Sequence, residues 1–160
     1  MRDDTAYALE TAPSFAFVQT QLIREVPREE MPLLGNSRDV FEFSQTRLFS
    51  PNDREHFWVL LLDGKHRVIA ANHISTGTLS AALVHPREVF KPAIAIGAAA
   101  VILIHNHPSG DPTPSPEDIE ITTRLSDTGR LIGIHVLDHI IAGDGSFTSC
   151  FERGILQHSG

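Results

Sequence analysis

This chain of 160 residues has little of several residue types, and each shortage excludes a class of protein. It has one cysteine, Cys150, so it can form neither an internal disulfide nor a zinc site built from several cysteines. It has no apolar run of about 18 residues, the length that a membrane-spanning helix needs, and no basic leader followed by an apolar stretch. The sequence therefore argues against membrane insertion and secretion, and we expect a cytoplasmic protein.

Positive charge is scarce as well. The chain has 13 Lys and Arg residues against 20 Asp and Glu residues, which gives a formal net charge of -7. A surface that binds nucleic acid normally carries clustered Lys and Arg, because these side chains displace the counterions of the phosphates. No basic run is present, so we expect no nucleic-acid binding through a basic patch. A hydrophobic content of 41% over this length is enough for one core.

Hydrophobic periodicity predicts alternating helices and strands. Residues 14–26 have apolar side chains at helical spacing and stop at Pro27, so we expect a helix there, followed by a linker to residue 36. Residues 37–49 fit a second helix or an irregular approach to the core. The other expected elements are strands over 57–62, 67–74 and 78–84, a helix over 86–96, a strand over 98–104, a helix over 116–130, and strands over 134–142 and 147–151. Asp-Gly pairs at 63–64 and 144–145 predict two hairpin turns.

Two histidines follow the most apolar of these strands. The run 98–104 is rich in Val and Ile and leads into polar, Pro- and Gly-rich chain, as a buried strand does where it leaves a sheet. Side chains alternate along a strand, so His105 and His107 should point to one side and Asn106 to the other. Two imidazoles on one side of a strand end form a pair of candidate metal ligands.

A third candidate ligand lies at the start of the next helix. Ser115 is a typical N-cap, Pro116 suits the first turn, and Asp118 follows one turn after the cap. A loop that folds back over the strand end could bring Asp118 to the two histidines. Three nitrogen and oxygen ligands with a fourth position open to water are typical of catalytic zinc sites. Alternatively, Ser115 and Asp118 could serve only as a helix cap and as an acid that favours the helix dipole.

The spacing of these residues resembles a known metalloenzyme pattern. The second half of the JAMM (JAB/MPN metalloenzyme) signature is matched here. It consists of two histidines with one residue between them (His105 and His107), a serine after seven more residues (Ser115) and an aspartate after two more (Asp118). The run from His105 to Gly110 further resembles the RadC-type branch, and the resemblance extends over residues 39–156. It implies an α/β fold, a three-layer α-β-α JAB/MPN (cytidine-deaminase-like) sandwich around a mixed sheet. We expect this domain over residues 37–160, after an N-terminal helical extension and linker over 1–36.

The JAMM pattern also requires a glutamate ahead of the first core strand, which acts as general acid and base rather than as a ligand. Glu55, immediately before the strand expected over 57–62, fits this position by resemblance. Alone, it would pass for a solvated charge at a strand end. Glu88, Glu117 and Glu120 are alternative bases, because sequence distance does not fix which carboxylate reaches the metal site.

The resemblance implies a zinc-dependent metallopeptidase or isopeptidase-like hydrolase. Zn²⁺ would be held by His105, His107 and Asp118, and Glu55 would activate a zinc-bound water toward an amide of a peptide or protein substrate. Ser115 would donate a hydrogen bond to the oxyanion of the tetrahedral intermediate.

Two alternative functions remain. The first is a DNA-repair accessory or a metal-dependent nuclease, because the RadC name has been associated with DNA repair. The second is a non-catalytic MPN scaffold, which family members become when they lose their metal ligands. All the ligands are present here. Longer RadC-type proteins resemble a fusion to an N-terminal helix-hairpin-helix-like segment, but residues 33–36 do not resemble such a hairpin, so we expect this DNA-binding appendage to be absent.

The other histidines and the large aromatic residues are expected to be structural. His135 and His139 are four residues apart on a strand, which separates them by about 13 Å. We expect His139 to form a buried pair with the neighbouring Asp138. Residues with no partner at ligand spacing are His56, His66, His73, His85 and His158. Residues expected in the core are Phe57, Trp58 and Phe90.

Overall fold

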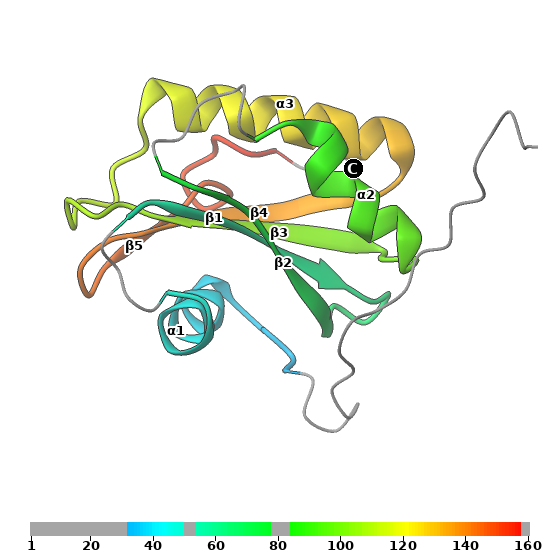
Figure 1. The fold of residues 1–160 in the computed structure, drawn as a ribbon, viewed down its shortest axis with the longest axis horizontal. Coiled ribbons are helices and arrows are strands. Elements are labelled where there is room, and N and C mark those ends of the chain that lie inside the picture. The colour runs from blue at the N-terminus through cyan, green and yellow to red at the C-terminus, as the bar shows by residue number, and fades with distance from the viewer. Residues whose placement is uncertain (1–31, 50–53, 78–83, 158–160) are drawn as a thin grey trace, which may run out of the picture.

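The computed structural model of the chain describes residues 32–49, 54–77 and 84–157 (Figure 1). Its elements in chain order are α1 (Ser37–Arg47), β1 (His56–Leu62), β2 (Val68–Thr76), α2 (Pro86–Ala95), β3 (Ala100–Asn106), α3 (Pro116–Ile132), β4 (His135–Ala142) and β5 (Phe147–Ser149). The helix expected over 14–26, and all but the last residue of the strand expected over 78–84, lie outside the described residues. No helix within the described stretches is long and apolar enough to cross a membrane.

The five strands form one mixed sheet in the order β2-β1-β3-β4-β5. β1 is antiparallel to β2 and β3, β3 is parallel to β4, and β4 is antiparallel to β5. A parallel pair needs a crossover connection, which α3 supplies. Both predicted hairpins are confirmed: β1 and β2 are joined around Asp63, whose carboxylate accepts from the backbone of Lys65 and Arg67, and β4 and β5 are joined around Gly145.

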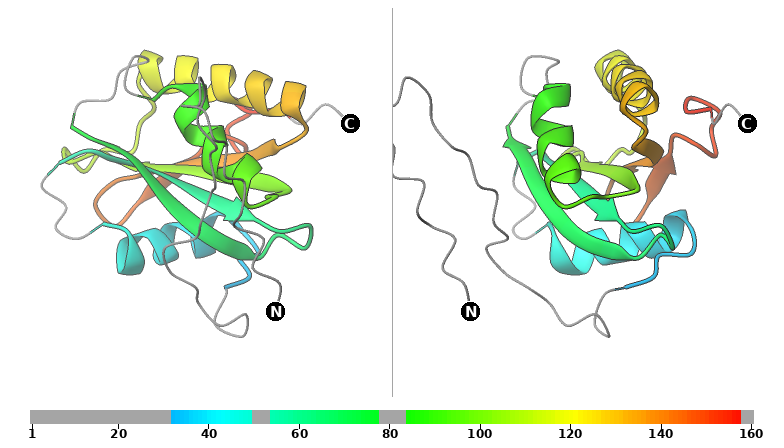
Figure 2. Two further views of the ribbon diagram at one scale, coloured as in Figure 1. Left: turned by 45° about the vertical axis from the view of Figure 1, so that its right-hand side comes forward. Right: turned by 90° about the vertical axis from the view of Figure 1, so that its right-hand side faces the viewer.

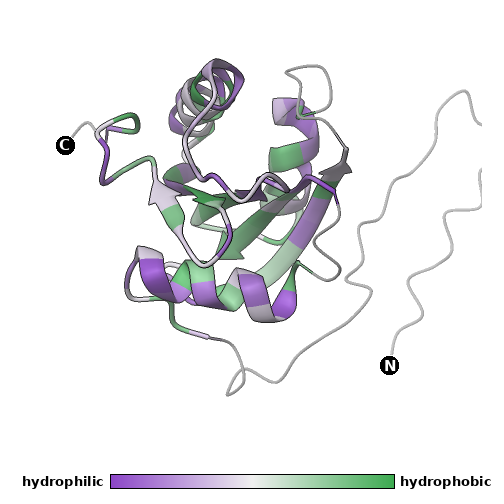
Figure 3. Cartoon of the chain, turned by 90° about the vertical axis from the view of Figure 1, so that its left-hand side faces the viewer, coloured by the Kyte–Doolittle hydropathy of each residue, from purple (hydrophilic) through white to green (hydrophobic). Residues whose placement is uncertain are grey.

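Helices cover both faces of the sheet. α2 and α3 lie on one face and α1 lies on the other (Figure 2). Apolar side chains fill both interfaces, one cluster beneath α2 and α3 and a second between the sheet and α1. Hydrophobic residues accordingly follow the strands, and the outer faces of the helices are more polar (Figure 3). The predicted three-layer α/β sandwich is confirmed.

β3 is the central strand, and every one of its residues is buried. It has a strand on each side and helices on both faces, which explains why its sequence is a continuous apolar run rather than an alternating one. The strand expected over 98–104 begins two residues later and extends to Asn106, so His105 belongs to the strand itself. Phe57 and Phe90 are buried as expected, whereas Trp58 is only partly buried, against the α1 side.

Candidate metal centre

The centre lies where β3 leaves the sheet. His105 is fully buried, and its ring stacks on Phe57 in the core beneath α2 and α3. The Nε2 atoms of His105 and His107 are 3.0 Å apart, as the predicted alternation requires. The backbone N–H of His107 donates to the carbonyl of Ala142, which extends the pairing of β3 with β4 past the end of the strand.

Asn106 points away from the two histidines, as predicted, and fixes the segment before β1. Its side-chain oxygen accepts a hydrogen bond from the backbone of His56 at 2.7 Å, and its amide donates to the carbonyl of Arg54 at 2.8 Å. These two bonds lie on either side of Glu55. Asn106 therefore anchors the backbone that carries the predicted base.

The loop after His107 folds back onto β4 and carries α3 toward the strand end. The backbone N–H of Asp144 donates to the carbonyl of Gly110 at 2.9 Å. Gly143 lies so close that a Cβ there would meet this carbonyl at 2.3 Å, so the approach requires glycine. The carbonyl of Asp111 accepts from Nδ1 of His107 at 2.7 Å, so in the neutral ring Nε2 has its lone pair toward the site, and in the protonated ring Nε2 donates there.

Asp118 completes the set from the first turn of α3. Its Oδ1 is 3.1 Å from Nε2 of His105, and its Oδ2 is 3.3 Å from Nε2 of His107. Burial alone would raise the pKa of Asp118, but the hydrogen bonds from the two histidines outweigh this and hold it well below its usual range. The same carboxylate raises the pKa of His107. The structure thus brings together the three residues that the sequence singles out as ligands.

Glu55 lies beside these three side chains. One ligand atom from each of Glu55, His105, His107 and Asp118 can be chosen so that all four lie within 4.8 Å of one another. Oε1 of Glu55 is 4.0 Å from Nε2 of His105.

The competing glutamates are elsewhere. Glu88 forms ion pairs on the surface of α2, and Glu117 and Glu120 are exposed on α3. Among the described glutamates, only Glu55 belongs to the cluster.

Ser115 forms a capping box with Asp118. Its Oγ accepts from the backbone N–H of Asp118 at 3.1 Å, and Oδ2 of Asp118 accepts from the backbone N–H of Ser115 at 2.7 Å. The predicted cap is confirmed. A hydroxyl that accepts in this way keeps its own proton to donate, so its predicted part in catalysis stays a prediction.

A buried histidine supports the centre from behind. Nε2 of His139 is 2.8 Å from Nδ1 of His105, and Nδ1 of His139 is 2.6 Å from Oγ1 of Thr122. The predicted pairing of His139 with Asp138 is wrong for the ring, and from His139 the Asp138 carboxylate accepts only the backbone N–H, at 2.7 Å. Neighbouring side chains on a strand point to opposite faces, so the Asp138 carboxylate lies on the other side, where it accepts from Ser149. The sequence carries no spacing signal for the contact with His105, which depends on the parallel pairing of β3 and β4.

These contacts fix the protons on both rings. The hydroxyl of Thr122 has one hydrogen, which it donates to the carbonyl of Asp118 at 2.6 Å, so it accepts from Nδ1–H of His139. Nε2 of His139 is then the acceptor for Nδ1–H of His105, and Nε2 of the neutral His105 ring keeps its lone pair toward the site; only a protonated ring would also donate to Asp118. Complete burial lowers the pKa of His139, which keeps this ring neutral.

The donor set suits a divalent cation. Two imidazole nitrogens and a carboxylate are ligands that zinc accepts, and the 3.0 Å between the two nitrogens is close to the edge of a tetrahedron whose bonds are about 2.0–2.1 Å. Oδ1 and Oδ2 of Asp118 lie 3.1 and 3.3 Å from the nitrogens of His105 and His107. Two Nε2 lone pairs at 3.0 Å repel each other unless a proton or a cation lies between them.

Residues 34–155 match the family model described as the RadC-like JAB domain. The chain belongs to this family. Similar proteins include the UPF0758 protein of Desulforudis audaxviator, 60% identical over 103 residues, which are 64% of this chain and 45% of that protein. The UPF0758 protein of Pelobacter propionicus is 53% identical over 128 residues, 80% of this chain and 56% of that protein. This RadC-like JAB domain thus spans about half the length of the curated relatives it matches.

Two other predictions on histidines have different outcomes. In this RadC-like JAB domain His135 is exposed at the start of β4, apart from the metal centre, and His66 is exposed in the β1–β2 turn. His56 and His73 have no partner at ligand spacing in the sequence, but the fold brings their rings together. Their ring nitrogens are 3.2 Å apart, because the antiparallel pairing of β1 and β2 brings together residues that are 17 positions apart in the sequence.

Proposed function

We propose that this domain is a zinc-dependent metallopeptidase or isopeptidase-like hydrolase acting on a peptide or protein in the cytoplasm. The observation that carries the proposal is the gathering of Glu55, His105, His107 and Asp118 at the end of β3. His105, His107 and Asp118 would hold the ion. When bound, zinc supplies Lewis acidity toward water and toward an amide carbonyl.

Glu55 is proposed as the general base and acid. Its Oε1 is 4.0 Å from Nε2 of His105, farther than the Asp118 oxygen at 3.1 Å, which supports action on a water molecule over direct binding of the ion. Anchoring by Asn106 on both sides of residue 55 supports a fixed position for this carboxylate. Glu55 would take a proton from the attacking water and return it to the leaving amine.

Ser115 is proposed to donate its hydroxyl proton to the oxyanion that forms at the substrate carbonyl. Its position at the N-terminus of α3 supports this role, because the helix dipole favours negative charge there. The excess of acidic over basic residues favours a peptide or protein over nucleic acid as substrate. The complete donor set argues against the non-catalytic scaffold.

The test is metal analysis of the purified full chain and of four variants, combined with assays on peptide and isopeptide substrates. We expect one tightly held zinc per chain in the wild type, in Glu55→Gln and in the surface control Glu88→Gln. His107→Ala and Asp118→Ala should lose it. Zinc retained at one equivalent in both ligand variants would disprove the ligand assignment, and cleavage of DNA instead of peptides would favour the nuclease.

A further inference from the structure

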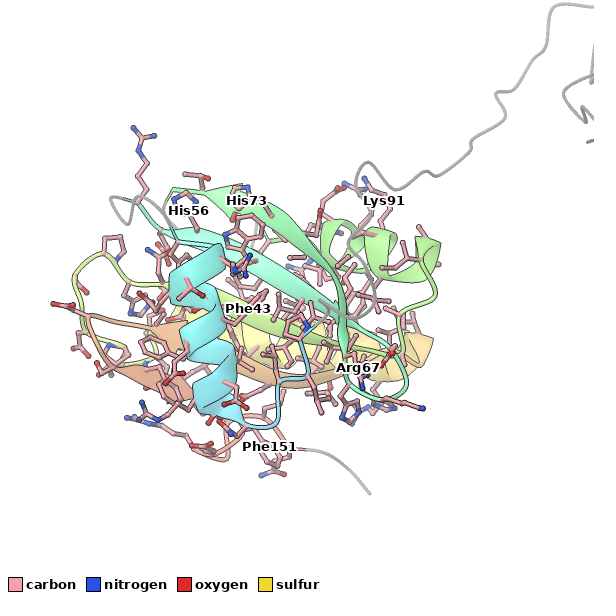
Figure 4. All side chains as sticks on the ribbon, turned by 90° about the horizontal axis from the view of Figure 1, so that it is seen from below. Phe43, His56, Arg67, His73, Lys91 and Phe151 are labelled. Atoms are coloured by element: carbon pink, nitrogen blue, oxygen red, sulfur yellow. The ribbon has the colours of Figure 1, made fainter. Side chains whose placement is uncertain are left out.

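A second group of nitrogen and oxygen atoms that could bind a metal lies at the outer edge of the sheet. Nδ1 of His56, Nε2 of His73 and Oγ1 of Thr76 form a triangle with sides of 3.2, 3.1 and 3.1 Å, hereafter the β-edge triangle. His56 comes from β1, and the other two residues come from β2. Figure 4 shows the side chains of His56 and His73 next to each other at this edge, seen from the side of α1.

An irregularity in β2 makes this arrangement possible. Phe57 pairs with Ser75 and Trp58 with His73, so β2 has one extra residue, Ile74, between the two pairs. In a regular strand, His73 and Thr76 would point to opposite faces, because they are three positions apart. The extra residue reverses this relation, as a bulge does, and directs both side chains to His56.

Hydrogen bonds use the three atoms of the triangle unequally. A ring nitrogen is either a donor or an acceptor, and a hydroxyl has one hydrogen. At most two of the three contacts can therefore be full hydrogen bonds, and the third is at best a shared one, in which one N–H or one lone pair serves two neighbours. A cation would instead engage a lone pair of each of the three atoms at once.

The dimensions also fit a metal. Three atoms about 3.1 Å apart, each bonded to an ion at about 2.0–2.1 Å, subtend angles of roughly 100° at that ion, near the tetrahedral value. The separations match those among the ligands of His105, His107 and Asp118, which are 3.0 to 3.3 Å. Burial and the neighbouring His56 lower the pKa of His73, which favours the neutral ring that a metal requires.

The β-edge triangle is separate from the metal centre. Phe57 packs with His105 in the core beneath α2 and α3, whereas Trp58 packs in the cluster on the α1 side. The side chain of His56 points to the same side as that of Trp58, because they are two positions apart on β1. The two groups thus lie on opposite faces of β1.

We propose that His56, His73 and Thr76 form a second site, for a divalent transition-metal ion that prefers imidazole ligands. Of these ions Cu²⁺ should bind most tightly, since copper heads the affinity order for nitrogen donors, followed by Ni²⁺ and Zn²⁺. His73 and Thr76 are exposed, so water completes the coordination. A bound ion ties β1 to β2 directly beside Glu55.

Trp58 provides the signal for a test on the full chain. It is the only tryptophan, and its ring centroid is 4.7 Å from that of His73. Cu²⁺ titrated into zinc-loaded protein should quench the fluorescence of Trp58 in a saturable manner, with one equivalent bound. His56→Asn and His73→Gln should each weaken the apparent affinity for Cu²⁺ by at least about tenfold. Loss of a residue that only supports a ligand already weakens metal binding by that much, and these residues are ligands themselves.

Two controls separate the sites. His66→Asn removes an exposed histidine from the β1–β2 turn, where φ is 59°, a conformation that asparagine tolerates, and should leave quenching unchanged. Asp118→Ala should lose the zinc centre and still show the quenching, so failure of the proposed function and failure of this site give different results. Circular dichroism of each metal-free variant checks the fold. Quenching that does not saturate, or that is unchanged in His73→Gln, would overturn the proposal.

Discussion

The two histidine groups of this protein have similar dimensions and different surroundings. His105 is completely buried, and a neutral second ring fixes its proton. His73 is exposed at the sheet edge, where its Nε2 contacts His56 and a hydroxyl and its ring has a backbone hydrogen bond with Ser75 but no buried second ring behind it among the described residues. Supporting hydrogen bonds orient a ligand before the metal arrives, so we expect the buried centre to bind more tightly and the β-edge triangle to exchange its ion. The difference lies in what holds the rings, not in how far apart they are.

The largest expected effect concerns the chemistry of the buried centre. Glu55→Gln keeps the shape of the side chain and removes its ability to accept a proton, so we expect turnover to be abolished while zinc stays bound. The measurements are the rate on a substrate found by the peptide screen and the metal content of the same sample. Glu88→Gln is the control, because Glu88 is exposed and ion-paired on α2. If Glu88→Gln lost activity and Glu55→Gln kept it, the base would be wrongly assigned.

A smaller effect on rate is expected at Ser115. Ser115→Ala removes the cap and should cost about 1 kcal/mol of stability. If the hydroxyl also stabilises the oxyanion, kcat should fall by about 10²- to 10³-fold with zinc retained. Ser115→Asp should restore the cap and remain inactive, since a carboxylate repels the developing negative charge. Denaturant unfolding and kcat are measured on both variants, and a fully active Ser115→Asp would leave Ser115 with the cap alone.

The support behind His105 can be removed without touching a ligand. Thr122→Val keeps the shape of the side chain but leaves Nδ1–H of His139 without its acceptor. The ring can recover a partner by moving its proton to Nε2, which would then force the proton of His105 onto the nitrogen that faces the metal. We expect zinc affinity to fall by about 10- to 100-fold in a chelator competition, with Thr122→Ser close to wild type.

Thr123→Val is the matched control for this change. Thr123 is exposed, and its hydroxyl makes the same bond to the carbonyl four residues earlier, at 2.9 Å, so its replacement has the same effect on the helix alone. Equal zinc affinity in the two valine variants would show that the Thr122–His139 contact does not support the centre. Nitrogen NMR of the His139 ring gives an independent reading, with the proton on Nδ1 in the wild type.

Much of the metal centre could be predicted from the sequence because its residues follow local rules. Alternation on β3 directs His105 and His107 to one side, and the N-cap at Ser115 places Asp118 one turn into α3. The role of His139 and the meeting of His56 with His73 could not be predicted. Both contacts depend on which residues of neighbouring strands pair, and no local sequence pattern encodes this. The meeting of His56 with His73 also depends on the extra residue in β2, which directs His73 and Thr76 to the same face of the sheet.

The smallest expected effect distinguishes the two groups by their response to pH in metal-free protein. Asp118 raises the pKa of His107 above its unfolded value, so its contribution to stability is present below about pH 6.5 and is lost as pH rises through the folded pKa. Burial and His56 lower the pKa of His73, so protonation favours the unfolded chain, and stability is lost as pH falls below about 6.5. The free energy of unfolding therefore changes with pH in opposite directions at the two histidines.

The measurement is urea unfolding between about pH 5 and 8, the range over which histidine changes charge. His107→Gln should remove a part of the unfolding free energy that falls as pH rises, and His73→Gln should remove a part that rises with pH. If both variants changed the pH dependence of the unfolding free energy in the same direction, the pKa values of His107 and His73 would not be shifted in opposite directions.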